Sequence, residues 1–144
     1  MTVWRLRSRL GNSPTITVMG NGMLLNRDGK TPTESEDKAA LAIEKSYGKP
    51  VSGDPKNFCL RRLADLQNNY ELISKEYPRK TTLGGHEAYE LIAIDADDET
   101  KEICMTILFE EDGGYYIFLG IYQVGAKQAK TDIKAVMETF SKRH

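Results

Sequence analysis

The stretch Tyr115–Gln123, YYIFLGIYQ, constrains the fold more than any other part of the chain. Aromatic and β-branched residues dominate it, and these residue types favour strands. Apolar side chains stand at both odd and even positions, so both faces of the strand have to be covered. We therefore expect this strand inside a sheet that has packing layers on both sides.

Period-two alternation or β-branched runs predict five further strands. They are Val3–Leu10 and Pro14–Gly20 in residues 1–30, and Tyr70–Tyr77, His86–Ala96 and Glu102–Glu111 in residues 70–144. The acidic segment DADDETK and the EDGG segment supply the turns between the later strands. The C-terminal strands are therefore predicted to form an antiparallel meander.

Capping signals and apolar stripes predict three helices. They cover about residues 33–48, about residues 55–69, and Ala126–Ser141. Thr33 is the expected N-cap of the first helix, with Glu36 at capping-box spacing, and Asp54 followed by Pro55 opens the second. We expect a single domain spanning residues 1–144, with an α+β fold in which helices flank an antiparallel sheet.

Composition argues against several classes of protein. The 144 residues carry a net charge of −1, without the basic excess that is typical of general nucleic-acid binding. No apolar run is long enough for a transmembrane helix, and the start of the chain lacks the apolar core of a secretion signal. We expect a cytoplasmic protein, or a periplasmic one if a leader has been removed. Cys59 and Cys104 are expected as free buried thiols.

The segment LGGHEAYEL looks more like a site than any other. Its glycines precede a strand rather than a helix, and no lysine follows them, so a phosphate loop is not supported. His86 and Glu87 are neighbours in a predicted strand and point to opposite faces, so they cannot share a proton. Gly84 and Gly85 are interpreted as a tight turn that leads into the strand.

Arg5, Arg7 and Arg9 alternate with apolar residues and would span about 13 Å on one strand face. A row of guanidinium groups suits an acidic protein surface or a series of phosphates. The favoured interpretation is a solvated face or a charged edge strand that resists aggregation. The row is still the strongest local basic feature and is the predicted edge of a binding surface.

Other reactive arrangements are missing from the sequence. The serines lie outside GxSxG and SxxK contexts, and no Cys/His cluster indicates zinc. The DADDET segment lacks the glycine and the final glutamate of a calcium loop, so we interpret it as a solvated hairpin turn. We predict no catalytic residue, no metal and no cofactor.

Two groups of positions carry a family resemblance between Asp54 and Lys142. One group opens a strand and the other closes the last helix: Gly84, Gly85, His86, Ala88 and Tyr89, then Ile133, Val136, Thr139 and Phe140. In these positions the chain resembles the PsbP-like superfamily, α/β/α sandwich proteins that include the DcrB-type and Eag-type groups. The N-terminal third departs from that family. The family has a P-x-x-W segment near the first strand, in which the proline comes before the tryptophan, whereas here Trp4 lies well before Pro14.

The resemblance implies a binding module or accessory factor without an active site. Eag-type proteins act as adaptors or chaperones for type VI secretion effectors, often as dimers. We therefore expect a non-catalytic adaptor or accessory domain that binds another protein, and an unpaired edge strand would permit a homodimer. The alternative is a small enzyme or ligand-binding domain with a pocket lined by His86 and Tyr89, and an enzyme is the less favoured of the two readings.

Overall fold

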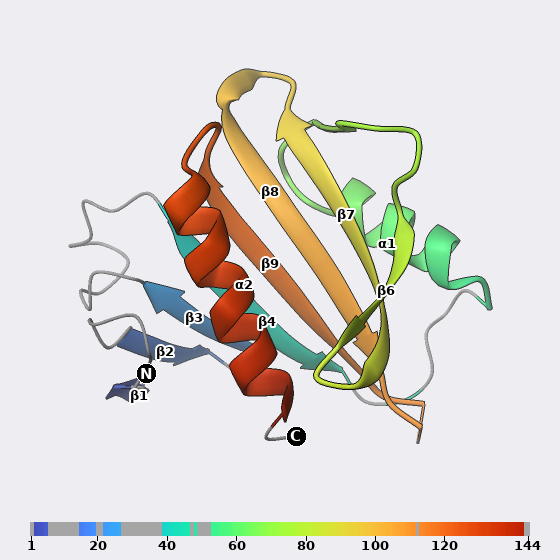
Figure 1. Ribbon diagram of the computed structural model, residues 1–144, viewed down its shortest axis with the longest axis vertical. Coiled ribbons are helices and arrows are strands. Elements are labelled where there is room, and N and C mark those ends of the chain that lie inside the picture. The colour runs from blue at the N-terminus through green and yellow to red at the C-terminus, as the bar shows by residue number, and fades with distance from the viewer. Residues whose placement is uncertain are drawn as a thin grey trace.

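Figure 1 shows a computed structural model of the chain. It describes residues 2–5, 15–19, 22–26, 39–46, 48, 53–111 and 113–142, and of residues 2–5, 15–19, 22–26 and 140–142 only the backbone. The described strands are β1 Thr2–Arg5, β2 Thr15–Met19, β3 Gly22–Asn26, β4 Ala40–Ser46, β5 Tyr70–Leu72, β6 Arg79–Leu83, β7 His86–Asp95, β8 Asp98–Phe109 and β9 Tyr115–Gln123. The described helices are α1 Pro55–Ala64 and α2 Lys127–Lys142.

All the described strands belong to one antiparallel sheet. Its order is β1-β2-β3-β4-β9-β8-β7-β5, and β6 also pairs with β7. The long strands β7, β8 and β9 follow one another as a meander (Figure 1). The predicted α+β fold with an antiparallel meander is confirmed. The strand YYIFLGIYQ, β9, lies between β4 and β8, inside the sheet as expected.

The two helices cover opposite faces of the sheet. On β8, Ile103 and Met105 pack in the same apolar cluster as α1, whereas Cys104 between them packs in the cluster that includes α2. Successive strand residues point to opposite faces, so the sheet has a helical layer on each side. We name these sides the α1 face and the α2 face. Their helical contributions are Phe58, Cys59 and Leu63 from α1, and Ala129, Ile133 and Met137 from α2.

The predicted helix at residues 33–48 is wrong where the structure describes that segment. Residues Ala40–Ser46 form β4, which pairs with β3 on one side and β9 on the other. Leu41 and Ile43 are buried on one face and Ala42 between them is half-buried, which is the alternation of a strand. This pairing and burial outweigh the preference of an alanine-rich segment for a helix. Residues 33–38 and 47 lie outside the described residues.

The edge of the sheet beyond β7 differs from the predicted strand Tyr70–Tyr77. β5 ends at Leu72, and a second short strand, β6, follows at Arg79–Leu83 and pairs with the other half of β7. β6 has the sequence RKTTL and only Leu83 in it is buried, so no apolar alternation marked it as a strand. Helix α1 begins after Asp54 as predicted, with the Asp54 carboxylate accepting the Lys56 backbone N–H at 2.9 Å, and it ends at Ala64 rather than residue 69.

Glycines meet specific backbone demands at two places in the C-terminal half. Gly84 and Gly85 have φ angles of 59° and 85° and form the turn between β6 and β7, which confirms the predicted tight turn. The Gly84 N–H also donates to Glu138 Oε1 at 3.2 Å, which connects the turn to α2. On β9, a Cβ atom at Gly120 would lie 2.7 Å from Ile133 Cγ2, so this glycine lets α2 approach the sheet closely.

Candidate functional site

The structure does not bring His86 and Tyr89 together. The Tyr89 ring lies on the α1 face, with its centroid 6.1 Å from that of Phe109. His86 begins β7, pairs with Leu83 and shares the α2 face with Ala88. The two residues proposed to line one pocket therefore stand on opposite sides of the sheet.

The arginine row lies largely beyond the described residues. Arg5 is the last residue of β1 and pairs with Thr15 of β2. β1 is one edge of the described sheet, which is where a charged edge strand is expected. Arg7, Arg9 and the side chain of Arg5 are outside the described part of the chain. The role of the row stays a prediction.

A buried carboxylate on the α2 face is paired with an exposed arginine of β6. Glu90 is only 9% exposed, and its Oε1 accepts a hydrogen bond from Arg79 Nε at 2.7 Å. Arg79 also lies over the Tyr77 ring, with 5.2 Å from Cζ to the ring centroid. The hydrogen bond to Glu90 raises the pKa of Arg79, and burial raises the pKa of Tyr77. Because Arg79 and Glu90 are register partners, this pair fastens β6 to β7.

A second set of buried polar groups lies under the N-terminal half of α2. Tyr122 is buried, and burial together with the neighbouring Glu102 carboxylate raises the pKa of its hydroxyl. Glu102 in turn forms an ion pair with Lys130 of α2 at 3.8 Å. Cys104 is buried in the same layer, and burial raises the pKa of its thiol.

The chemistry of these groups suits holding the layers together. A nucleophilic cysteine needs a lowered pKa, whereas burial raises that of Cys104 and raises that of Cys59 to about 12. Glu90 and Glu102 are each engaged by a cation from a neighbouring element. No cluster of His, Cys, Asp or Glu side chains within the described ranges could hold a metal ion.

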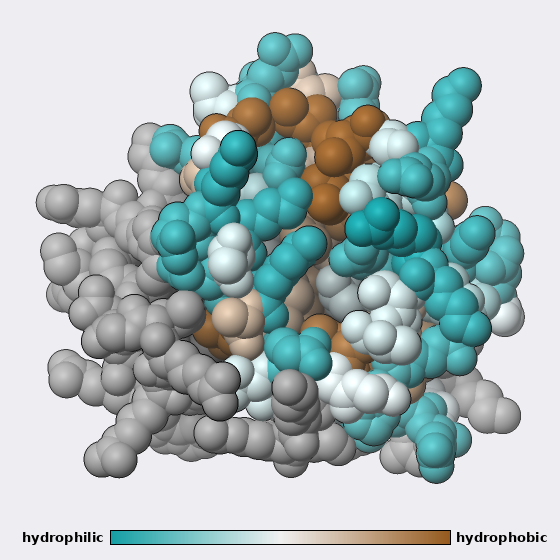
Figure 2. Space-filling model, in the orientation of Figure 1, coloured by the Kyte–Doolittle hydropathy of each residue, from teal (hydrophilic) through white to brown (hydrophobic). Residues whose placement is uncertain are grey.

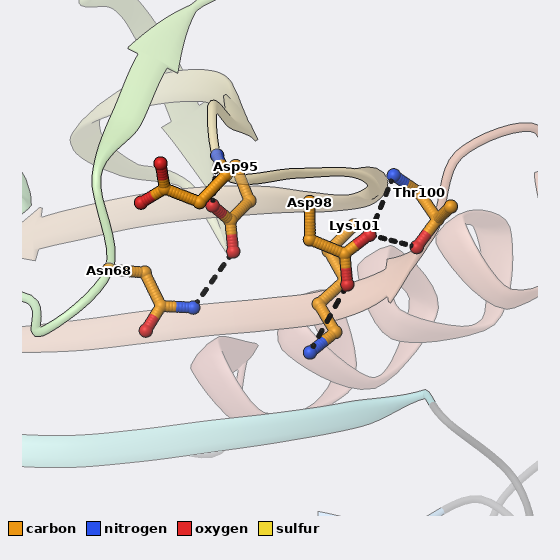
Figure 3. A network of polar contacts seen from close by, with 6 residues as sticks. Asn68, Asp95, Asp98, Thr100 and Lys101 are labelled. Carbon is orange, nitrogen blue, oxygen red and sulfur yellow. Dashed lines mark hydrogen bonds and ion pairs between the residues drawn. The ribbon is translucent and has the colours of Figure 1, made fainter.

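The hairpin between β7 and β8 is acidic and internally ordered (Figure 3). Asp95 accepts from Asn68 Nδ2 at 2.9 Å and from the Asp97 backbone N–H at 2.9 Å. Asp98 accepts from the hydroxyl and the backbone N–H of Thr100, and these two bonds hold the pKa of Asp98 below its ordinary value. The predicted hairpin is confirmed, but β8 begins at Asp98 rather than Glu102, and Asp95 is buried rather than solvated. The Ala96 N–H donates to the Asn69 carbonyl, which anchors the turn to the segment that follows α1.

Large apolar side chains are exposed near this hairpin. Ile73, just after β5, is 48% exposed and its backbone N–H donates to the Ile92 carbonyl. Val124, just after β9, is 47% exposed and its N–H donates to the Thr100 carbonyl at the start of β8. Figure 2, which views the α2 face, shows apolar side chains gathered over the ends of β7 and β8 next to the hairpin.

We name this region the hairpin-end surface and define it by Ile73, Ile94, Val124, Glu71 and Glu99. Ile94 is half-buried and lies opposite Glu71 in the register, on the same face as Ile92. Sequence reasoning missed the surface, because alternation predicts which face a residue takes but not whether a helix covers that face. The available signal was Val124 beside Gly125, an apolar residue at a turn.

Two comparisons with known proteins found no match. No protein-family model matches the chain, and a search of curated proteins gave no significant relative. Neither helix in the described part of the chain is long and apolar enough to cross a membrane.

Proposed function

We propose that this protein is a non-catalytic binding domain that holds another protein through the hairpin-end surface. The observation that carries the proposal is the exposure of Ile73 and Val124 at the same end of the sheet, 48% and 47% respectively. Exposed apolar side chains that gather on one part of a surface are typical of sites that are covered by a partner. Half-buried Ile94, on the strand next to β5, adds apolar area on the Ile73 side.

The buried polar groups support a non-catalytic role. The carboxylates of Glu90 and Glu102 are paired with Arg79 and Lys130, so neither is placed as an unengaged acid or base. Both cysteines have raised pKa values, which keep the thiols protonated at neutral pH.

We also propose that the domain belongs to the PsbP-like group of α/β/α proteins. A sheet with one helix on each face supports this assignment, as does the Gly84–Gly85 turn that opens β7. A role as an adaptor or accessory factor is the function that such an assignment implies. The proposal rests on fold-level likeness and on the exposed surface together.

A capture experiment with matched variants tests the proposed function. The wild-type domain, an Ile73→Ser/Val124→Ser variant and a Leu60→Ser control are immobilised and exposed to native lysate, and bound proteins are identified by mass spectrometry. Leu60 is 38% exposed but lies on α1, on the opposite side of the sheet. We expect one dominant partner that the wild type and the Leu60→Ser control retain and the double variant loses. Equal capture by all three proteins would contradict the proposal.

The arginine row has its own test. Reversal of Arg5, Arg7 and Arg9 to glutamate should leave the domain folded, because a charged edge strand is tolerant of surface changes. The row begins on β1, at the opposite edge of the described sheet from β5, so it would be a second contact separate from the hairpin-end surface. If the partner uses this second contact, it is lost from this variant too. Retention of full binding would remove the arginines from the site.

A further inference from the structure

We infer that the partner segment held by the hairpin-end surface combines apolar side chains with lysine or arginine. This inference rests on the proposed function and names the chemistry of its partner. It is carried by exposed carboxylates that stand close along the chain, or across one backbone hydrogen bond, to each exposed apolar residue. Glu71 stands two residues before Ile73, and Glu99 is next to Thr100, whose carbonyl accepts the Val124 N–H.

The carboxylates at this surface differ in whether they are already engaged. Asp98 forms an ion pair with Lys101 at 3.6 Å, and Glu102 forms one with Lys130 at 3.8 Å. Glu71, Asp97 and Glu99 are exposed, and among the described residues none of them takes part in an ion pair. These three charges remain available to an incoming cation.

The net charge near the hairpin-end surface stays negative when the neighbouring lysines are included. Lys75 and Lys127, which are exposed and follow Ile73 and Val124 in the chain, offset only part of the charge of the three carboxylates. The acidic stretch Asp95–Glu102 places five carboxylates and one ammonium group in the hairpin. Complementary charge steers an encounter and suppresses wrong partners, while the buried apolar contacts supply most of the affinity. A basic segment with apolar side chains satisfies both demands.

A peptide selection measures the chemistry of the partner directly. A library of random 12-residue peptides displayed on phage is selected on the wild-type domain, with removal of phage that also bind the Ile73→Ser/Val124→Ser variant. We expect the surviving peptides to be enriched in Lys or Arg and in Leu, Ile, Val or Phe. Enrichment of acidic or uncharged peptides, or recovery of no peptide that depends on Ile73 and Val124, would overturn the inference.

Charge reversal provides the matched control. In a Glu71→Lys/Glu99→Lys variant, the selected peptides should bind about tenfold more weakly, because two surface attractions become repulsions. A Glu87→Lys variant should bind them unchanged, because Glu87 is exposed at the other end of β7, where it pairs with Lys80. Equal binding by both variants would contradict a basic partner.

The two proposals fail in different ways. If peptides of another chemistry are selected while partner capture still depends on Ile73 and Val124, the basic partner is wrong and the binding surface stands. If capture from lysate does not depend on those residues, the proposed function falls and this inference falls with it.

Discussion

The α1 face and the α2 face each bury an apolar cluster, but they differ in how far the charges near each helix are buried. On the α1 face, the Phe58 ring packs edge-on against Tyr115 and Phe109, with centroids 4.9 Å and 6.2 Å apart. On the α2 face, the apolar stripe of α2 is supplemented by ion pairs at Glu102 and, beside β6, at Glu90. An ion pair joins each helix to the sheet, but the Arg62–Glu44 pair of α1 is 33% and 48% exposed, whereas Glu102, the partner of Lys130 on α2, is only 16% exposed. Buried charge therefore contributes more to the α2 layer than to the α1 layer. The α1 layer should respond mainly to loss of volume, and the α2 layer also to changes of charge.

Removal of the Phe58 ring should cause the largest loss of stability. Phe58 is buried in the centre of the α1 layer, so Phe58→Ala should lower the free energy of unfolding by about 3–5 kcal/mol. Urea unfolding followed by circular dichroism measures the change. Leu60→Ala, at an exposed position of the same helix, should change it by less than about 0.5 kcal/mol. Equal effects of the two substitutions would show that α1 is not docked as described.

A methyl group at Gly120 should disturb the α2 layer. Because a Cβ there would lie 2.7 Å from Ile133 Cγ2, Gly120→Ala should cost about 1–3 kcal/mol of unfolding free energy. Gly53→Ala is the control, since nothing lies near its Cβ position. Ile133→Ala removes the opposing methyl group, so the double variant should lose less than the sum of the single ones. Additive losses would contradict the close approach of α2.

Neutralising Glu90, a buried carboxylate on the α2 face, should lower stability more than neutralising an exposed carboxylate on the other face of the same strand. Glu90→Gln replaces the ion pair with Arg79 by a hydrogen bond from the charged guanidinium to an uncharged amide oxygen, and should lower the unfolding free energy by about 1–2 kcal/mol. The matched control is Glu87→Gln on the same strand, where the pair with Lys80 is 3.8 Å long and more than half exposed. That control should cost less than about 0.5 kcal/mol. Thermal unfolding of both variants at low and at high salt checks the comparison.

Alkaline pH should produce the smallest effect for each group and act through the buried thiols, of which Cys59 lies on the α1 face. The folded-state pKa of Cys59 is raised to about 12 from an ordinary value of 9.0, so the unfolded chain loses this proton first as the pH rises. The Cys59 contribution is therefore intact below pH 9 and should fall by about 1 kcal/mol between pH 9 and pH 10, and Cys104 on the α2 face adds to the loss because burial raises its pKa as well. Urea midpoints measured across this range for the wild type and Cys59→Ala test the origin of the loss. An unchanged slope in the variant would assign it to another group.

Most of the C-terminal half could be predicted from the sequence, because its signals agree with one another. Asp54 and Pro55 mark the start of α1, Gly84 and Gly85 mark a turn, and the run from Tyr115 to Gln123 has the β preference and two-sided burial of an interior strand. Local preference, periodicity and turn chemistry all lead to the observed structure there.

The segment around β4 could not be predicted, because its local preference opposes its tertiary surroundings. Ala39, Ala40 and Ile43 fit a helical stripe, but pairing with β9 decides the outcome and depends on residues far along the chain. The candidate site was missed for a related reason. Whether Ile73 is covered depends on where α2 ends up, and no pattern within Tyr70–Tyr77 carries that information.

Because β4 pairs with β9, one strand of the pair is synthesised well before the other. Ala40 lies opposite Ile121, so a strand made early has to wait for a partner that leaves the ribosome much later. At roughly 5–20 residues per second, that wait lasts several seconds. During it, Leu41 and Ile43 have neither β9 beside them nor α2 over them. During synthesis β4 can pair only with β3, and its apolar side chains stay uncovered until the C-terminal third of the chain has been made.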